Sequence, residues 1–439
     1  MRSRRWSVVA LCTGAALLGG SVAFRLVAVP ALVRFPDNVD QTARYTGTAL
    51  TYVDPATLLP LSTPKSDPLS LSRHVKVVSS DFNRAVIDET VTIQAGATTS
   101  VENYQYVMDR RSMKLVADPR QYAFGDPTAT MHAAGTYRIN FAMGTTAGGS
   151  YLAYIPEADA STPLVLARGR HYHANAHATV IDFSSKLEAP VAPYYLAHLK
   201  SMGLPTQVTA AQLQPLLLAS GIDVNKALAD VGPKLTPQES ALLAATLAKP
   251  VTLNYFFIAD GLVSIEPTTG ALVDVHAQQE GVAVQPDLSG VAALKPLLDK
   301  YSGIPSVRAL STGLAALAAR PPQPAQTFQY VQTPASSLAI ATKAHQQARL
   351  MGILNWWAPA VLALLGLILI GFGLVGWRRT RVPAPDGSSD HSLGESPTQP
   401  STPGGPTIPV PVSASAAGPP TVLPERDSLA PTDETLQGV

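Results

Sequence analysis

The sequence predicts an α+β fold: an antiparallel, β-rich extracytoplasmic domain with a helical insertion, flanked by two transmembrane helices. Two apolar runs lie near opposite ends of the chain, and each reaches the roughly 20 residues that a helix needs to cross a bilayer. Between them, short runs rich in Val, Ile, Thr and Tyr are separated by turn residues, which is typical of antiparallel strands. One stretch of this central region instead carries helix-capping patterns.

The first apolar run, Trp6–Phe24, predicts an N-terminal transmembrane anchor over residues 1–33. Arginines precede it, and because arginine stays on the cytoplasmic side of a span, the N-terminus is expected in the cytoplasm. A cleaved signal peptide is the alternative, since small residues at Ala23 and Ala31 offer cleavage points, but the run is longer than a signal's apolar region. The chain's one cysteine, Cys12, lies here, so the outer domain has no disulfide.

The second run, Trp356–Trp377, predicts the other transmembrane helix. Thr333-Pro334 is typical of a helix start, so a juxtamembrane helix and the span are expected together over residues 333–377. Arginines follow at once, which places this end in the cytoplasm and the region 34–332 outside the membrane. Residues 378–439 are rich in Pro, Ser, Thr and Gly without hydrophobic periodicity, and they predict a disordered cytoplasmic tail.

Small residues on both runs predict that the two helices pack together, because small side chains let helices approach closely in lipid. They recur at Ala15, Gly19 and Ala23, and at Ala363, Gly366, Gly373 and Gly376. Neither run has an ionisable residue near its centre, which indicates anchors rather than pore-lining helices.

The region 34–332 is expected to form the β-rich domain. Its strand-like runs are Gly47–Tyr52, Val75–Val78, Ala85–Gln94, Tyr104–Met108, Tyr137–Ala142, Tyr151–Ile155, Pro163–Ala167, Ala178–Phe183, Thr252–Ile258, Leu262–Ile265 and Ala271–Val275. Gly144–Ser150 lacks the lysine of a phosphate-binding loop. It is expected to be a hairpin between the strands on either side of it.

Residues 205–249 predict a helical insertion in this domain. Thr209–Gln212 and Thr236–Glu239 both fit the capping box, and Asp223 suits the N-cap of a short helix between them. Ser306–Ala319 predicts a further helix.

An acid followed three residues later by a hydroxyl residue recurs in Asp54–Thr57, Asp109–Ser112 and Glu266–Thr269. Such a pattern is typical of a tight turn, in which the acid accepts hydrogen bonds from backbone N–H groups. One interpretation is ordinary hairpin chemistry. The other is a pair of duplicated, curved antiparallel sheets around an apolar groove, as in lipid carriers of the cell envelope.

Three histidines are the best candidates for metal binding. His171, His173 and His177 would share one face of a strand, and imidazoles grouped in this way can bind Zn²⁺. A carboxylate would come from Glu157 or Asp159. The alternative is a solvated polar face of the strand.

Other kinds of chemistry find little support in the sequence. It has no nucleophile elbow, dinucleotide fingerprint or zinc-protease motif, so we predict neither catalytic residues nor a cofactor. Lys+Arg 32 against Asp+Glu 31 leaves no basic excess for a nucleic-acid partner.

Several short motifs between the two apolar runs resemble those of an actinobacterial family of membrane proteins, some of which are labelled porin PorA. The motifs are Val33–Pro36, Gly47–Tyr52, Asp109-Arg110 and Glu266–Gly270. The resemblance covers roughly residues 1–380, and the label implies passage of solutes across the envelope. The chain departs from the family where Tyr151–Ile155 lacks an acid.

Three functions follow as hypotheses. The first is a non-enzymatic membrane protein of the cell envelope whose outer domain binds an apolar ligand, such as an envelope lipid, or a protein partner. The second is a porin or channel-forming homo-oligomer, as the family label implies. The third is a metal-dependent envelope hydrolase built on the three histidines. In every case the expected location is the cell membrane, in contact with the lipid bilayer.

Overall fold

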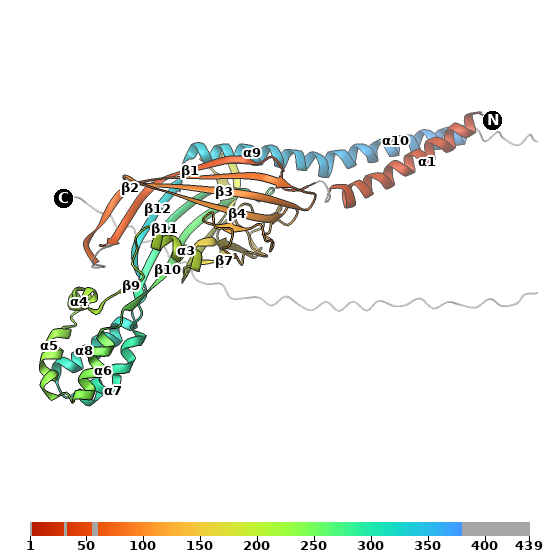
Figure 1. The fold of residues 1–439 in the computed structure, drawn as a ribbon. Coiled ribbons are helices and arrows are strands. Elements are labelled where there is room, and N and C mark those ends of the chain that lie inside the picture. The colour runs from red at the N-terminus through yellow and green to blue at the C-terminus, as the bar shows by residue number, and fades with distance from the viewer. Residues whose placement is uncertain (1, 30–32, 55–59, 380–439) are drawn as a thin grey trace, which may run out of the picture. The chain divides into compact units, whose positions relative to one another are not determined.

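A curved antiparallel sheet forms the centre of the fold (Figure 1). The computed structural model describes residues 2–29, 33–54 and 60–379, which all belong to one unit of the chain, Met1–Arg381. Eleven strands follow one another in the order β5-β4-β3-β2-β1-β12-β11-β10-β8-β7-β6, and β9 pairs with β10 outside this order. The sheet curves into a half-barrel. With its helices, it confirms the predicted α+β class.

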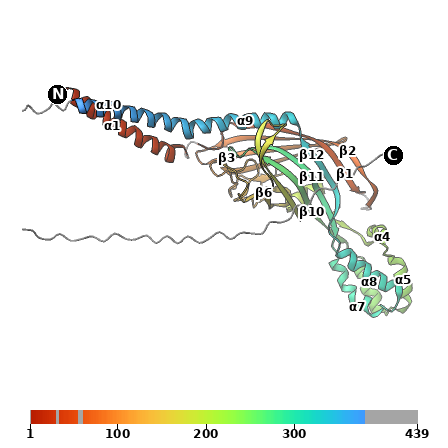
Figure 2. The same ribbon diagram turned by 180° about the vertical axis from the view of Figure 1, so that it is seen from behind.

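The strands are β1 (Asp40–Val53), β2 (Pro60–Ser80), β3 (Arg84–Ala95), β4 (Thr98–Asp109), β5 (Tyr122–Ala123), β6 (Tyr151–Ile155), β7 (Ala160–His173), β8 (Ala178–Pro190), β9 (Gln207–Val208), β10 (Val251–Ile265), β11 (Leu272–Pro286) and β12 (Gln323–Gln332). The first and last of them, β1 and β12, pair at the middle of the sheet, as the view from behind also shows (Figure 2).

Most of the predicted strands are present, and two of them prove to be one. The runs 252–258 and 262–265 are parts of β10, which bends at a register shift between Asp260 and Gly261. A Cβ atom at Gly261 would lie 2.7 Å from the carbonyl oxygen of His276 on β11. Only glycine permits this close approach of the two strands.

The predicted strand Tyr137–Ala142 and the hairpin after it are wrong. These residues make only isolated bridges, from Tyr137 to Ala153 and from Asn140 to Ala271. Their alternation has another cause: Tyr137, Ile139 and Phe141 enter the main core. They belong to a long irregular segment that begins after β4 and packs against the sheet. In residues 137–142 the alternation of apolar side chains therefore reflects burial against the core and not pairing in a β-sheet.

Two groups of helices are inserted between strands. Residues between β8 and β10 form α3 (Pro193–Ser201), α4 (Ala210–Ala219), α5 (Val224–Val231) and α6 (Pro237–Leu247), with a 3₁₀ turn, η3 (Gly232–Lys234). Residues between β11 and β12 form η4 (Leu288–Leu294), α7 (Lys295–Lys300) and α8 (Pro305–Ala318). Another 3₁₀ turn, η2 (Pro156–Ala158), follows β6.

The caps predicted from the sequence are confirmed. Thr209 and Thr236 each form a complete capping box with the Gln or Glu three residues later. The Asp223 side chain accepts a hydrogen bond from the backbone N–H of Lys226 at 2.9 Å. Side chains at these positions satisfy N–H groups that a helix leaves free in its first turn.

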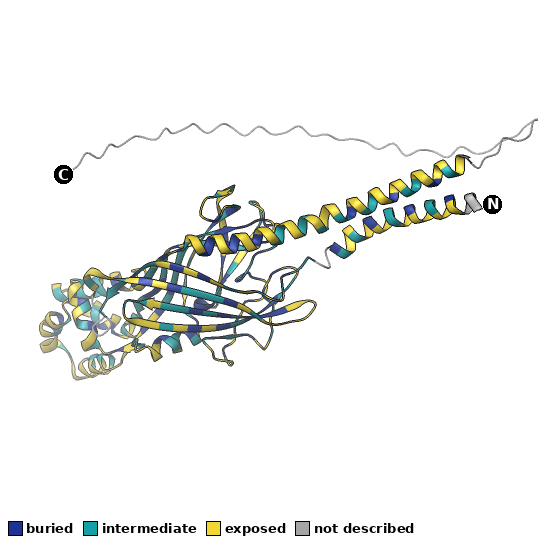
Figure 3. Ribbon diagram, turned by 90° about the horizontal axis from the view of Figure 1, so that it is seen from above, coloured by how far each residue is buried: buried dark blue, intermediate teal, exposed yellow. Residues whose placement is uncertain are grey.

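Two long apolar helices flank the sheet domain in the chain. The first comprises α1 (Arg2–Ala23) and a π-helical turn, η1 (Phe24–Ala28). The second runs without a break through α9 (Pro334–Gly352), η5 (Ile353–Trp357) and α10 (Ala358–Arg379). Only 17% of the most apolar window of each is buried within the chain, so neither is the core helix of a soluble domain (Figure 3).

The predicted packing of these helices is confirmed on α10, but the partner face of α1 was wrongly placed. Ideal Cβ atoms at Gly366 and Gly373 would lie 2.8 Å from the carbonyl oxygen of Gly14 and 2.7 Å from Leu11. Gly19, a predicted contact, has no such neighbour within 4 Å. The buried positions on α1 recur every seven residues, at Ser7, Gly14 and Ser21, which is the spacing of a coiled-coil seam.

The predicted disordered tail lies outside the described residues from residue 380 onward, and so does most of the turn predicted at Asp54–Thr57. The other two acid turns are present. Asp109 accepts a hydrogen bond from the backbone N–H of Ser112 at 2.7 Å, and Glu266 accepts one from that of Thr269 at 2.7 Å.

Candidate functional site

The three histidines lie near one another in sequence but bind different partners. His171 and His173 are on β7, where their Nε2 atoms lie 3.3 Å from Asp182 and 3.1 Å from Asp274. His177 is in the turn that follows rather than on the strand, with a left-handed φ of 48°.

The carboxylates proposed to complete a metal site are also occupied elsewhere. Asp159 pairs with His132 at 2.5 Å and accepts a hydrogen bond from Tyr154, while Glu157 belongs to another cluster. Among the described residues, no group of three or more His, Cys, Asp or Glu could hold a metal ion. This arrangement lends the metal-site hypothesis no support, and it stays a prediction.

An apolar pocket lies among the inserted helices. It has a volume of about 230 Å³, and its walls come from α4, α5, α6, η4, α7 and α8. Leucine and valine dominate the lining, which includes Leu213, Leu228, Leu243, Leu247, Leu298 and Leu310. Several of these side chains are only partly buried by the protein itself. The pocket can therefore remove further apolar surface from water when a ligand enters.

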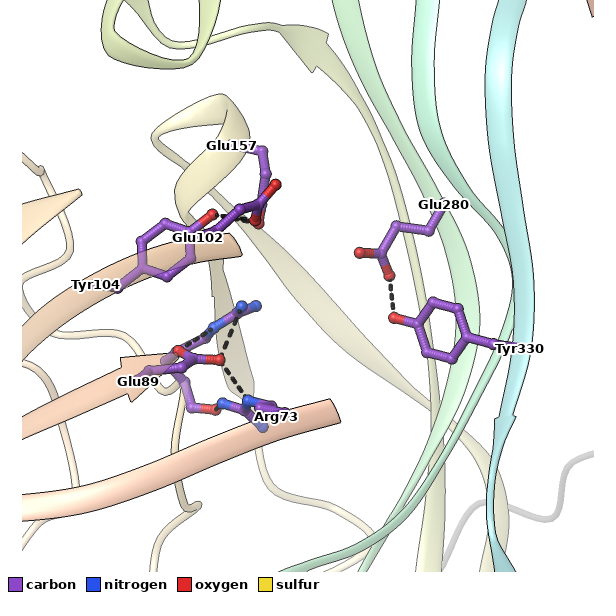
Figure 4. Close-up of polar contacts among 8 residues, drawn as sticks. Arg73, Glu89, Glu102, Tyr104, Glu157, Glu280 and Tyr330 are labelled. Atoms are coloured by element: carbon purple, nitrogen blue, oxygen red, sulfur yellow. Dashed lines mark hydrogen bonds and ion pairs between the residues drawn. The ribbon is translucent and has the colours of Figure 1, made fainter. Parts of the chain in front are cut away.

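A second cavity, of about 180 Å³, lies inside the half-barrel and has charged walls (Figure 4). Glu89 on β3 is fully buried between two arginines: Arg73 donates from Nε to Glu89, and Arg138 donates from Nε and Nη2 at 3.3 Å. Burial alone would raise the pKa of Glu89, but the two guanidinium groups outweigh it and lower the pKa to about 2. Glu89 is therefore ionised at neutral pH.

Glu102 on β4 and Glu157 on η2 share one hydroxyl group. The Tyr104 Oη atom lies 2.8 Å from a Glu102 oxygen and 3.2 Å from a Glu157 oxygen. Because a tyrosine hydroxyl has a single proton, it can donate to only one of them. Both contacts are favourable when one carboxyl is protonated. Burial and the mutual repulsion of the pair raise the pKa of Glu102 to about 8, and burial raises that of Glu157 to about 7.

Glu280 on β11 faces these groups from the other side of the cavity (Figure 4). It accepts a hydrogen bond from the Tyr330 hydroxyl at 2.5 Å, and burial raises its pKa. The cavity walls thus carry Glu89 between two arginines, which together leave one positive charge in excess, and three further carboxyl groups whose hydrogen bonds come from tyrosines.

A third cavity, of about 380 Å³, adjoins the second and is walled partly by α9. Ile340, Lys343 and Leu350 line it on the helix, and Tyr45 and Arg73 line both cavities. The two cavities therefore lie next to each other on the concave side of the sheet. Together their walls extend from β4 to α9, the first part of the second apolar helix.

Comparison with known families tests the resemblance to porin PorA proteins that the short motifs indicated. The model of the family described as porin PorA matches residues 6–375. The chain belongs to the porin PorA family. Its match begins in α1 and ends in α10, so the apolar helices and the sheet domain are parts of one PorA family unit. No curated protein matches the chain.

The PorA assignment confirms the predicted resemblance and indicates a protein of the envelope membrane that is not an enzyme. The two apolar helices are consistent with membrane insertion.

The charged cavity was not predicted from the sequence, although a signal for it exists. On β3, Glu89 lies two residues from both Ile87 and Val91, so it shares their face of the strand. On β4, Glu102 shares a face with Tyr104 and Tyr106 in the same way. An acid in phase with the apolar residues of a strand lies on the buried face.

Proposed function

We propose that this PorA family member is a non-enzymatic membrane protein of an actinobacterial cell envelope that binds an apolar ligand in the pocket among its inserted helices. The observation that carries this proposal is the lining of the pocket, in which Leu, Val and Ala predominate. Each methylene group of a ligand that enters such a pocket contributes about 0.8 kcal/mol. Affinity should therefore rise about fourfold per added methylene until the pocket is full.

A series of n-alkanols tests the proposal. The full-length chain in lipid nanodiscs would be titrated with alkanols of increasing length in competition with a fluorescent apolar dye, with empty nanodiscs as the blank. We expect Leu243→Asn to weaken dye binding at least tenfold. Leu242→Asn is the matched control, because Leu242 lies on the same helix, is exposed and does not line the pocket. Equal binding by both variants would refute the site.

For the topology we propose that both termini are cytoplasmic and the sheet domain is extracytoplasmic. The arginines outside each apolar run support this orientation. At the opposite end of the helices the Arg25 guanidinium lies 4.3 Å from the centre of the Trp356 ring, and such amphipathic side chains suit a membrane interface.

Single cysteines test the orientation, starting from a Cys12→Ser background. A membrane-impermeant maleimide added to intact cells should label Ser220→Cys in the helical insertion and should not label Ser401→Cys in the tail. The reverse pattern would overturn the topology.

The family name favours a second candidate, a channel-forming oligomer. Conductance of the purified protein in planar bilayers would support it, and conductance that persists after Gly366→Leu would show that the helix pair is not its wall. A third candidate, the metal-dependent hydrolase, would be supported if the wild-type protein binds zinc and the His173→Ala variant does not.

A further inference from the structure

The cavity inside the half-barrel has more acid than base. Arg73 and Arg138 are engaged by Glu89, and no described lysine or arginine forms an ion pair with Glu102, Glu157 or Glu280. At the rim, Asp260 adds another carboxylate, which is partly exposed and pairs with Lys186 only at 3.8 Å. With all four glutamates ionised, the two arginines would leave two negative charges uncompensated, and a cavity partly shielded from water holds such an excess only when protons or a cation offset it.

Tyr106 supplies a second, independent indication of a ligand. Its side chain is fully buried, and its hydroxyl has no hydrogen-bond partner among the described residues. It lies on the same face of β4 as Glu102, and its ring stacks on that of Tyr104 at 6.1 Å. The charges of Glu89, Arg138 and Glu157 all act on the Tyr106 hydroxyl, although Tyr106 itself does not line the cavity. Buried hydroxyl groups rarely lack a partner.

Aromatic rings complete the walls and point to the class of cation. Those that line the cavity are Tyr45, Tyr137, Phe141, Tyr154, Tyr195, Phe257, Phe328 and Tyr330. The faces of such rings attract organic ammonium groups. A bare metal ion would need convergent ligands, which no group of described acids and histidines provides. The volume of about 180 Å³ is below the roughly 300–1,000 Å³ of pockets that hold drug-sized ligands, so the ligand is small.

We propose that the half-barrel cavity binds a small organic ammonium ion, with Glu102, Glu157 and Glu280 as its counter-charges. The ammonium group donates to the carboxylates, and its aliphatic part lies against the aromatic rings. This site is separate from the apolar pocket among the helices, so either proposal can fail without the other. Because the ligand replaces protons on the buried carboxyl groups, binding at neutral pH releases protons.

Calorimetry with n-butylammonium chloride tests the proposal, with sodium butyrate as the anionic probe of similar size. The full-length chain in nanodiscs would be titrated at pH 8, and empty nanodiscs would give the blank. We expect saturable binding of butylammonium and none of butyrate. Butylammonium affinity should fall at least tenfold from pH 8 to pH 5. Repeating the pH 7 titration in buffers of different ionisation enthalpy should reveal proton release. Equal binding of both probes, or no saturable binding of butylammonium, would overturn the proposal.

Two isosteric variants locate the site. Glu102→Gln and Glu157→Gln should each weaken butylammonium binding at least tenfold, and each should reduce the number of protons released. Glu188→Gln removes the same charge from an exposed position on β8 outside the cavity and should bind as the wild type does. A thermal melt of each variant checks that it folds. If either glutamine variant fails to fold, the wild-type titrations still test the proposal. The absence of a pH dependence or of proton release in the wild type would contradict it.

Discussion

The paired carboxyl groups in the half-barrel predict that the protein loses stability as the pH rises. The pKa of Glu102 is about 8 in the folded chain, compared with 4.5 for a free glutamate side chain. Between these two values the folded state holds a proton that the unfolded state has lost, and each pH unit costs about 1.4 kcal/mol. The stabilisation is complete below pH 4.5. It is lost progressively up to about pH 8, by on the order of 3–5 kcal/mol.

Glu102→Gln removes the Glu102 share of this dependence without changing the shape of the side chain, and Glu157, whose pKa is about 7, keeps a smaller share. At pH 5, where the wild-type carboxyl is already neutral, the variant should melt within a degree or two of the wild type. At pH 9 it should melt higher by roughly 6–20 °C, since 1 kcal/mol corresponds to about 2–4 °C in a domain of this order of size. Thermal unfolding of the full chain in nanodiscs from pH 5 to pH 9 measures both, with Glu188→Gln as the control. A wild-type melting temperature that stays constant over this range would refute the reasoning, and so would a parallel decline in the variant.

Three further predictions concern single contacts. Glu89→Gln leaves two buried arginines without their carboxylate and should lower the stability at pH 7 by about 3–5 kcal/mol in chemical or thermal unfolding. Because the pKa of Glu89 is about 2, the wild type loses this contribution as the pH falls from 4.5 to 2, whereas the variant should not. Gly366→Leu should separate the two apolar helices, because a side chain there would clash with Gly14 on α1. The loss of an engineered disulfide between one cysteine on each helix would measure this separation. Gly371→Leu is the control, because a Cβ atom at Gly371 would have no neighbour within 4 Å, and the disulfide should still form. Thr236→Ala removes a complete capping box and should cost about 1 kcal/mol in thermal unfolding.

Local chemistry made part of this fold predictable. The capping boxes at Thr209 and Thr236 and the acid turns at Asp109 and Glu266 each depend on residues three apart, so neighbouring positions contain all the information. The length of the apolar runs predicted the two long helices for the same reason. β12 was missed because it has Gln at 323, 326, 329 and 332 and a Pro at 324, which read as a loop. Its place between β1 and β11 depends on partners far along the chain.

The charged cavity shows a different limit. Each acid was visible as a polar residue in phase with an apolar strand, but their convergence depends on how the half-barrel curves. Glu102, Glu157 and Glu280 come from β4, η2 and β11, which are separated by long stretches of sequence. The spacing of residues along the sequence therefore does not predict that these three carboxyl groups lie close together. The histidines show the same limit: His171 and His173 are close in sequence but pair with separate aspartates on β8 and β11. His177 contacts the Tyr172 hydroxyl instead.

The family name implies a path for solutes, and the geometry restricts where one could run. Among the described residues the end strands β5 and β6 do not pair with each other, so the sheet stays open. An open sheet leaves backbone groups unpaired at its edges and is not tolerated in the hydrocarbon of a bilayer. Of the elements that the structure describes, only the apolar helices α1 and α10 then suit the membrane, and two helices cannot enclose a pore. They also pack closely against each other at Gly14, Gly366 and Gly373. Ion conduction would need several copies whose apolar outer faces form a channel without polar lining. An apolar pocket beside a membrane-anchored sheet needs no such assembly, and for this reason we favour ligand binding over conduction.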